Sequence, residues 1–383
     1  MVSTRIRKTR SFISKVITMI QRITLLSFLA LFLTGCGPEE STEKSAGTVN
    51  TGKTYNWKMV TTWPPGFPVL QEGAEKFAEN IKAMSNGRLN IKVYAGGELI
   101  PALQTFDAVS QGTVEMGHGS AYYWAGKVPE AQLFSTVPFG MTARGMNAWL
   151  YEGGGLELWR EVYKPFHVIP FPLGNTGVQM GGWFNKEINS LDDIQGLKMR
   201  IPGLGGKVFA KAGGSPVLLA GSEVYTALER NTIDATEWLS PYHDQRLGLY
   251  RAAEYYYYPG WHEPGTVLEL TINERAWNSL PDDLKAIVSN AAMAENLRMF
   301  SEMEQKNASA LQELKDREGI QILPFPDDVI SRLSTLTEET LAEESANNPK
   351  FKKVYEAYDA FRKKDNAWSA ISEKAYLDIK EEK

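Results

Sequence analysis

Cysteine is almost absent from this chain of 383 residues, which contains only Cys36. A single cysteine excludes an intrachain disulfide and any metal site built from several thiolates. Histidine is scarce too, and none of the four residues forms a recognisable pair with a serine or with the cysteine, as a hydrolase would require. An excess of positive charge is also lacking. The net charge of −5 and the pI of about 5.6 therefore give no sign of a nucleic-acid partner.

Long apolar runs are few, and the clearest, ITLLSFLALFLTG at residues 23–35, is too short to span a bilayer comfortably. It follows a basic segment and leads into LTGC, which resembles the lipobox of bacterial lipoproteins. The resemblance implies a lipoprotein signal peptide over residues 1–36, cleavage before Cys36, acylation of its thiol and a lipid-anchored periplasmic protein. The alternative is an ordinary hydrophobic N-terminal helix. Translation could also begin at Met19, which gives a more compact signal than Met1.

The rest of the chain has an ordinary globular composition, with 43% hydrophobic and 23% charged residues. Residues 37–54 are small and polar and lack aromatic side chains, which is typical of a flexible tether. From Tyr55 onward the length allows one large two-lobed domain or two ordinary domains.

Strand and helix patterns alternate after Tyr55, which predicts an α/β fold with a parallel sheet. Short apolar runs predict strands, helical spacing of apolar residues predicts helices, and Pro/Gly clusters mark the turns between them. The first expected series consists of strands at 57–62, 89–94 and 114–117 and helices at 69–84 and 103–110. Ligands bind beyond the carboxyl ends of such strands, so the loops at 62–68, 96–101 and 119–124 are candidates for the site.

A second alternation begins near residue 166. Its expected strands lie at 167–172, 178–185, 198–201, 217–219, 233–238, 255–258 and 267–273, with helices at 206–213 and 222–230. Ser222 is a candidate N-cap for the last of these helices, with Glu223 adding negative charge to its first turn. The glycine run at 153–155 predicts a break between two helices, because no Lys-Ser or Lys-Thr follows it as in a phosphate-binding loop.

Two α/β lobes joined by crossing strands form a clamshell, with the ligand in the cleft between them. The expected first lobe comprises mainly residues 55–173 and 259–318, and the second mainly 174–258 and 319–345. Long helices end the chain, and residues 346–383 form a helical tail.

Polar residues at the ends of apolar runs gather between residues 174 and 242. They are Asn175, Gln179, Arg200, Glu237 and Trp238. The planar fork of an arginine matches a carboxylate in two parallel hydrogen bonds. Glutamine and glutamate oxygens are hard donors that suit sodium or calcium. This set of residues therefore predicts a site for a small carboxylate with an accompanying cation.

Several motifs in order resemble the solute-binding proteins of tripartite ATP-independent periplasmic (TRAP) transporters. They are WKMVTTW, YAGGEL, QGTVEMGHGSAYYW, LKMRIPG, IDATEW and PGWHEPG, and the resemblance covers residues 55–376. It is closest to the branch that binds 2-oxo acids and other small monocarboxylates. It implies a type II-like periplasmic binding protein fold, ligand capture without turnover, and partners in the transporter's membrane subunits.

The resemblance also implies roles for particular residues. Arg200 would bind the substrate carboxylate, and Asn175 would donate an amide hydrogen bond to it. The amide oxygen of Gln179, the carboxylate of Glu237 and the backbone carbonyl of Trp238 would hold a bridging cation. Tyr122 or its neighbour Tyr123 would line the cleft with His262.

Each candidate has a structural alternative. Arg200 could pair with Asp192 or Asp193 on the surface, and Glu237 could pair with Arg246. Gln179 could face solvent. Trp238, Tyr122, Tyr123 and His262 could be ordinary packing residues.

The charges in a closed cleft bear on the cation, because uncompensated buried charge is costly. Arg200, Glu237 and a monocarboxylate together leave one negative charge. Sodium balances it and calcium exceeds it, so the count favours sodium, provided that no other buried charge joins the site. Asp234 and Asp244 are close enough in sequence to change this count.

In the 2-oxo acid branch a C-terminal helix is exchanged between two subunits, and the tail of this chain resembles that helix. The resemblance therefore implies a homodimer, and the alternative is a helix that packs on its own subunit. A periplasmic enzyme acting on a small organic acid and a ligand-sensing lipoprotein are the rival functions. The sequence leaves the identity of the acid open, from pyruvate to other 2-oxo acids and larger monocarboxylates.

Overall fold

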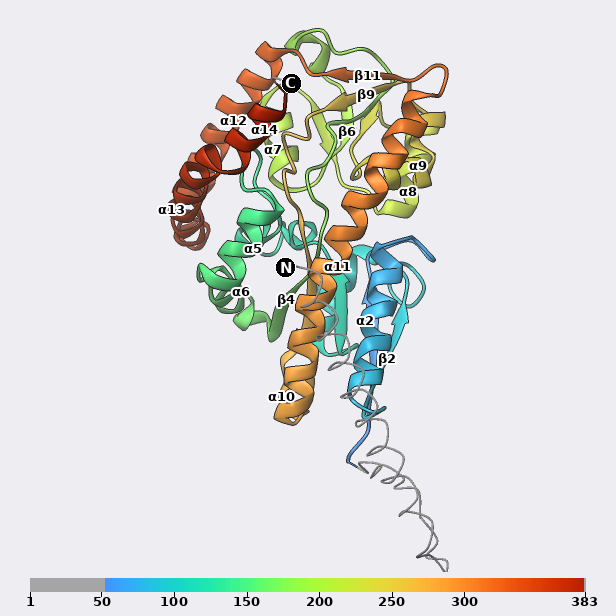
Figure 1. Cartoon of the computed structure of the whole chain (residues 1–383), viewed down its shortest axis with the longest axis vertical. Coiled ribbons are helices and arrows are strands. Elements are labelled where there is room, and N and C mark those ends of the chain that lie inside the picture. The colour runs from blue at the N-terminus through green and yellow to red at the C-terminus, as the bar shows by residue number, and fades with distance from the viewer. Residues whose placement is uncertain (1–51, 382–383) are drawn as a thin grey trace, which may run out of the picture. The chain divides into compact units, whose positions relative to one another are not determined.

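A computed structural model describes residues 52–381. Its strands form two sheets (Figure 1). The first has the order β2 (Leu89–Tyr94), β1 (Tyr55–Thr61), β3 (Met116–Gly119), β10 (Val267–Asn273) and β4 (Val168–Asn175). The second has the order β11 (Gln321–Pro324), β9 (Tyr255–Tyr258), β5 (Gly182–Phe184), β8 (Ala235–Thr236), β6 (Lys198–Arg200) and β7 (Ser215–Val217). The predicted signal peptide with Cys36, and tether residues 37–51, lie outside the described residues.

The helices follow the predicted alternation. They are α2 (Leu70–Met84), α3 (Thr105–Gln111), α4 (Gln132–Ser135), α5 (Ala143–Glu152), α6 (Gly155–Tyr163), α7 (Gly203–Lys211), α8 (Gly221–Glu229), α9 (Pro241–Leu247), α10 (Glu274–Ser279), α11 (Asp282–Lys315), α12 (Asp327–Asn347), α13 (Pro349–Ile371) and α14 (Glu373–Glu381). Short 3-10 helices include η2 (Ala121–Trp124) and η6 (Leu249–Arg251). Within residues 52–381, no helix combines the length and the apolarity needed to cross a bilayer.

The two sheets are the cores of the two lobes of a clamshell, as predicted. Strands of the first sheet come from residues 55–175 and 267–273, and those of the second from 182–258 and 321–324. The chain therefore passes between the sheets three times, at 176–181, at 259–266 and at 274–320, where α10 and α11 lie. We call the first two passages the crossing segments. They hydrogen-bond to each other, since Thr176 N donates to Thr266 O at 3.0 Å and Gln179 N donates to Glu263 O at 3.1 Å.

The first sheet is mixed, so the prediction of a parallel sheet is only partly right. Strand β1 pairs in parallel with β2 and β3, whereas β10 runs antiparallel to β3 and β4. The physical reason is connectivity. Strand β10 enters the sheet through the second crossing segment, from the end at which β4 leaves it.

Long helices join distant parts of the chain. Helix α11 packs against β4 and α2 of the first lobe and against α9 of the second (Figure 1). The predicted break between α5 and α6 is confirmed, and Gly154 there has φ 84°, a conformation that favours glycine. The predicted N-cap at Ser222 is wrong, because the helix begins at Gly221. Its first turn is held instead by Glu223, whose carboxylate accepts from Ala220 N at 3.0 Å.

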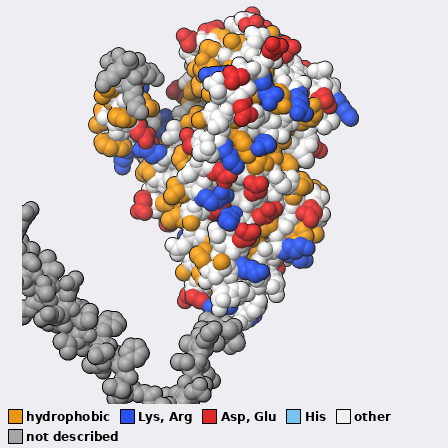
Figure 2. All heavy atoms as spheres, turned by 45° about the vertical axis from the view of Figure 1, so that its right-hand side comes forward, with side chains coloured by type: hydrophobic (Ala, Val, Ile, Leu, Met, Phe, Trp, Pro, Cys, Tyr) orange, Lys and Arg blue, Asp and Glu red, His pale blue; other side chains and the backbone are white. Residues whose placement is uncertain are grey.

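Acidic and basic side chains are interspersed over the face of the molecule drawn in Figure 2. Several acidic side chains are buried instead, and Glu269 lies deepest among them. Glu269 of β10 is completely buried and accepts hydrogen bonds from Trp124 Nε1 and from Tyr163 Oη, the latter at 2.8 Å. Both donors are neutral, so they offset the loss of water around the carboxylate only in part. Burial raises the pKa of Glu269 to about 7, although the two hydrogen bonds lower it in part.

This buried carboxyl makes stability depend on pH. Its pKa in the folded state is above the unfolded value of 4.5, so the folded protein binds more protons between pH 4.5 and pH 7. The stabilisation is present below pH 4.5 and is lost as the pH rises through 7. We predict that Glu269→Gln is more stable than the wild type at about pH 8, by ~1–3 kcal/mol.

Urea unfolding over this pH range tests the prediction, with the exposed Glu152→Gln as the control. The wild type and the control should lose stability along the same curve, which other buried acids share. The Glu269→Gln curve should be flatter. Parallel curves for all three proteins would contradict the assignment.

Candidate functional site

Arg200 and Glu237 lie side by side because neighbouring strands end there. Arg200 is the last residue of β6 and is in register with Thr236, the last residue of the parallel strand β8. Glu237 follows directly, and its backbone N–H donates to Arg200 O at 3.2 Å. Both side chains are only 1% exposed. The carboxyl ends of two parallel strands thus bring a cation and an anion together inside the protein.

The guanidinium of Arg200 is held on several sides. Nη1 donates to Glu237 Oε1, and Nη2 donates to Tyr123 Oη at 3.4 Å. The ring of Trp238 lies 5.1 Å from the guanidinium carbon, within the range of a cation–π contact. The suggested surface pairs of Arg200 with Asp192 or Asp193, and of Glu237 with Arg246, are therefore wrong.

Gln179 lies on the first crossing segment and is held in one orientation. Its Nε2 donates to Glu263 Oε2 at 2.7 Å and to Thr176 Oγ1 at 3.1 Å. The amide oxygen consequently points the other way. It is buried and finds no hydrogen-bond partner among residues 52–381. The alternative that Gln179 faces solvent is wrong, because its side chain is 3% exposed.

Asn175 presents the opposite end of its amide. Its Oδ1 accepts from Gly177 N at 2.9 Å, so the NH₂ group is the part left over. Within the described chain, Asn175 Nδ2 is buried without an acceptor. Glu237 Oε2 and Trp238 Nε1 are likewise buried without partners in residues 52–381. Native proteins rarely bury polar atoms unsatisfied, so a cluster of such atoms needs an explanation.

Glu263 joins this cluster, although the sequence did not identify it as a site residue. It lies on the second crossing segment, is 2% exposed, and accepts from Gln179 and from Thr266 Oγ1 at 2.5 Å. Ligand atoms of Glu237, His262 and Glu263 all lie within 4.8 Å of one another. The charge count assumed that no further buried charge joins the site. Glu263 does join it, so that assumption is wrong. Of the two acids suspected instead, Asp244 is bound by Trp183, Tyr256 and Leu239 N, and Asp234 accepts from Lys198 N.

Burial dominates the electrostatics of these groups. It raises the pKa of Glu237 to about 7 and that of Glu263 to about 7, while the positive charge of Arg200 partly lowers both. Burial lowers the pKa of His262 to about 4, so the imidazole is neutral at pH 7. For Arg200 burial acts to lower the pKa, but the charge of Glu237 outweighs it and the net shift is upward. The site accordingly keeps a permanent cation beside two acids that are reluctant to ionise.

Of the two tyrosines, Tyr123 touches the cluster through its bond to Arg200. Tyr122 packs edge-on against Tyr123, with ring centroids 4.9 Å apart, and is 7% exposed. It also faces the start of α7 from the other lobe. A Cβ on Gly203, which has φ 61°, would lie 3.0 Å from Tyr122 Cβ.

His262 is 1% exposed, and its Nε2 lies 3.6 Å from Glu237 Oε2. Neither ring nitrogen has a hydrogen-bond partner among the described residues. This geometry is not that of a satisfied structural histidine, and among residues 52–381 no serine hydroxyl hydrogen-bonds to the ring as the nucleophile of a Ser-His pair would. Phe67 lies in the expected loop at 62–68. The centroid of its ring is 6.0 Å from that of Trp238, so it adds an aromatic side chain to the site.

Comparison with known proteins identifies the family. Residues 59–347 match the model of the bacterial extracellular solute-binding proteins, family 7. The chain belongs to this family. This confirms the resemblance found in the motifs. A relative from Nostoc sp., described as a monocarboxylate 2-oxoacid-binding periplasmic protein, is 43% identical to this family 7 protein over 344 residues, which is 90% of this chain and 93% of the relative.

Two solved structures are similar over most of the chain. A TRAP periplasmic solute-binding protein from Colwellia psychrerythraea, with bound calcium and pyruvate, is 44% identical with a TM-score of 0.83 and covers 85% of this chain and 100% of its own. One from Pseudoalteromonas atlantica, with bound sodium and pyruvate, is 42% identical with a TM-score of 0.83 and covers 85% of this chain and 99% of its own. The two-lobed fold predicted from the sequence is thus the fold of these binding proteins.

The burial of the Arg200–Glu237 pair leads to a prediction about stability. Removing one partner of a buried ion pair leaves an uncompensated charge, so Arg200→Ala should lower the free energy of unfolding by ~3–5 kcal/mol at about pH 8, where Glu237 is ionised. The double variant Arg200→Ala/Glu237→Ala should lose less than the sum of the two single variants.

Urea unfolding of the four proteins gives this double-mutant cycle. Arg230→Ala, which removes an exposed arginine of the same lobe, should change the stability by no more than about 0.5 kcal/mol. Strictly additive losses would mean that the two side chains do not interact.

Proposed function

We propose that this chain is the extracytoplasmic solute-binding subunit of a TRAP transporter, and that it captures a small monocarboxylate such as pyruvate through Arg200 and a bridging cation. The observation that carries the proposal is the set of buried atoms without partners. Gln179 Oε1 and Glu237 Oε2 are oxygens that suit a cation, and Asn175 Nδ2 is a donor that suits a carboxylate. A ligand that is negative at one end and is bridged by a cation would satisfy both kinds of atom at once.

Different residues of the chain would bind the carboxylate and the cation. Arg200 and Asn175 donate hydrogen bonds to the carboxylate. The amide oxygen of Gln179, the carboxylate of Glu237 and the backbone carbonyl of Trp238 hold the cation, which supplies a fixed charge next to the acid's oxygens. Thr176 and Glu263 keep the amide of Gln179 turned so that its oxygen faces the site. The aromatic rings of Tyr123, Trp238 and Phe67 exclude water from these contacts.

The charge count now includes Glu263. With both glutamates ionised, Arg200 and a monocarboxylate leave two negative charges, and a calcium ion balances them. With one glutamate protonated, a sodium ion balances the remaining charge. The related proteins that hold pyruvate with calcium or with sodium fit these two states. We expect this site to accept either ion.

The rival functions receive less support. A periplasmic lyase or hydrolase would need a nucleophile with a base. Among the described site residues, His262 is the one group with a suitable ring, and it has no hydrogen-bond partner. Family 7 proteins serve transport, which favours capture and release over turnover. Lipid anchoring through Cys36 stays a prediction from the sequence, because it lies outside the described residues.

Ligand binding should stabilise the folded state, since only that state has the site. We predict that pyruvate with sodium or calcium raises the thermal midpoint, by an amount equivalent to about 2.7 kcal/mol when pyruvate is at a hundred times its Kd. Arg200→Ala should abolish the rise. Glu237→Gln should reduce it and remove its dependence on the cation.

Thermal shift measurements over 2-oxo, 2-hydroxy and dicarboxylic acids, with each cation and with neither, test these outcomes. The exposed Glu187→Gln is the matched control and should behave as the wild type. A cation-dependent shift that survives in Glu237→Gln would remove that carboxylate from the cation site. An unchanged shift in Arg200→Ala would remove the guanidinium from the substrate site.

The homodimer is also part of the proposal. Helix α13 packs on its own chain, where Tyr358 Oη accepts from Met141 N at 2.9 Å, and Arg144 of α5 pairs with Asp365 and with Glu373 of α14, each at 3.0 Å. Large apolar side chains are exposed at the end of α13 and on α14. They are Trp368 (60%), Ile371 (75%), Leu377 (57%) and Ile379 (60%). An apolar face of this kind is suited to a subunit interface.

We predict that Trp368→Ser/Ile371→Ser converts a dimer to a monomer, because it removes the most exposed apolar contacts of α13. Light scattering on the purified protein at micromolar concentration measures the mass. Lys364→Glu, on the same helix, should leave the dimer intact. A wild-type protein that is monomeric under these conditions would rule out the tail as a dimer interface.

A further inference from the structure

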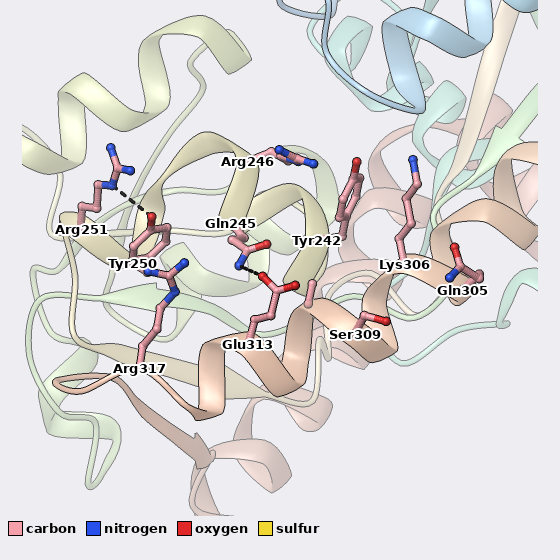
Figure 3. A pocket seen from close by; sticks show the side chains of 11 residues that line it. Tyr242, Gln245, Arg246, Tyr250, Arg251, Gln305, Lys306, Ser309, Glu313 and Arg317 are labelled. Carbon is pink, nitrogen blue, oxygen red and sulfur yellow. Dashed lines mark hydrogen bonds between the residues drawn. The ribbon is translucent and has the colours of Figure 1, made fainter.

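A groove of about 470 Å³ lies outside the proposed ligand site, between α9, η6 and the C-terminal half of α11 (Figure 3). Its lining is unusually rich in cations. Arg246 and Arg251 come from the α9–η6 side, Lys306 comes from α11, and Arg317 lies two residues beyond the end of that helix. Residues of the two sides are far apart in the sequence, so only the fold brings these charges together.

The cations form two pairs, each on a tyrosine ring. Arg246 and Lys306 lie over Tyr242, at 5.2 Å and 4.8 Å from the ring centroid. Arg251 and Arg317 lie over Tyr250, at 5.4 Å and 4.3 Å. Figure 3 draws Arg251, Tyr250 and Arg317 at the left, and Arg246, Tyr242 and Lys306 from the centre to the right. We call them the Tyr242 pair and the Tyr250 pair.

Between the pairs lies the one carboxylate that lines the groove. Glu313 Oε2 accepts from Gln245 Nε2 at 2.8 Å, as Figure 3 shows. Among residues 52–381, the three arginines form no ion pair with a carboxylate, whereas Lys306 pairs with Glu302 at 2.5 Å. The groove therefore keeps an excess of positive charge on a chain whose net charge is −5.

The spacing of these charges favours one kind of occupant. A compact anion such as phosphate needs donors that converge on a single point, whereas these cations rest on two separate tyrosine rings with Glu313 between them. An extended chain with acidic groups at intervals would reach both pairs and would meet the polar centre of the groove between them. Guanidinium groups resting on aromatic rings are well suited to carboxylates, which they bind in a bidentate manner.

The groove also adjoins the junction of the two lobes. Tyr242 packs edge-on against His243, with ring centroids 5.1 Å apart, and His243 Nε2 lies 3.0 Å from Pro68 O of the first lobe. Phe67 contacts both His243 and Trp238, with centroid distances of 5.4 Å and 6.0 Å. A partner in the groove would therefore rest on residues that are anchored to both lobes and lie near the ligand site.

We propose that this groove binds an extended acidic segment of a protein partner. Given the proposed function, on which this step rests, the fitting partner is a membrane subunit of the transporter, which must recognise the binding protein before ligand is released. Such electrostatic contacts guide encounter and set specificity more than they set affinity.

Fluorescence anisotropy with the full-length protein tests the proposal. The probe is a labelled peptide of about twelve residues that alternates Glu and Ser, with a Gln/Ser peptide of the same length as its neutral counterpart. We expect the Glu peptide to bind and the Gln peptide not to bind, and the binding to weaken as salt is raised. Arg246→Glu/Arg317→Glu, with one reversal in each pair, should weaken binding about tenfold or more.

Two controls make the result specific. Arg275→Glu reverses an exposed arginine on α10, beyond the opposite end of α11, and should bind the Glu peptide as the wild type does. The thermal shift by pyruvate should be the same in Arg246→Glu/Arg317→Glu as in the wild type, so a failure of the groove is distinguishable from a failure of the ligand site.

Three results would overturn the proposal. The first is equal affinity of the wild type and Arg246→Glu/Arg317→Glu for the Glu peptide. The second is displacement of the peptide by inorganic phosphate at an equal concentration of charge, which would mean a site for a compact anion. The third is binding to phosphatidylglycerol vesicles without binding to the peptide, which would mean a lipid surface.

Discussion

A guanidinium and a carboxylate meet inside this protein at the ends of two neighbouring strands, and each is 1% exposed. Removing both from water costs several kcal/mol per ion, so the pair of Arg200 and Glu237 is a weak source of stability. Its contribution is positional. The backbone register of β6 and β8 fixes where the two charges lie, and the packing of Tyr123 and Trp238 keeps water away from them. The surrounding structure keeps these two charges out of water. We attribute their burial to ligand binding, because it contributes little to the stability of the fold.

The crossing segments explain how a neutral amide becomes part of the same site. Gln179 and Glu263 belong to different passages of the chain between the lobes, yet the two passages hydrogen-bond to each other. Because Glu263 and Thr176 take the N–H groups of the amide, its oxygen has one direction left to face. The segments that would bend during closure are thus the same segments that orient a proposed cation ligand. Closure and cation binding are expected to be coupled for this reason.

Local patterns were enough to predict much of this arrangement. The strands at β6 and β8, with Arg200 and Glu237 at or just beyond their ends, follow from short apolar runs and from motifs that mark the family.

The features that could not be predicted from the sequence depend on long-range contacts. Glu263 lies 84 residues from Gln179, and nothing in its neighbourhood signals that it faces the site. The choice between Tyr122 and Tyr123 depends on the direction in which each ring leaves η2. The antiparallel placement of β10 depends on where the chain crosses back. The charges of the groove are separated by more than half of α11 and by the whole of α10 and β10, so no local pattern could indicate them.

The start of α7 bears on how the lobes meet. Gly203 faces Tyr122 across the cleft, and a Cβ on Gly205 would lie 3.0 Å from His262 Cβ. At both contacts a methyl group would require the neighbouring side chain to shift by a few tenths of an ångström. At residue 203 the positive φ adds backbone strain, so a side chain there would disfavour the closed arrangement of the lobes without changing any residue of the proposed ligand site. Binding of the acid to the open protein and closure of the two lobes around it would then become separable steps.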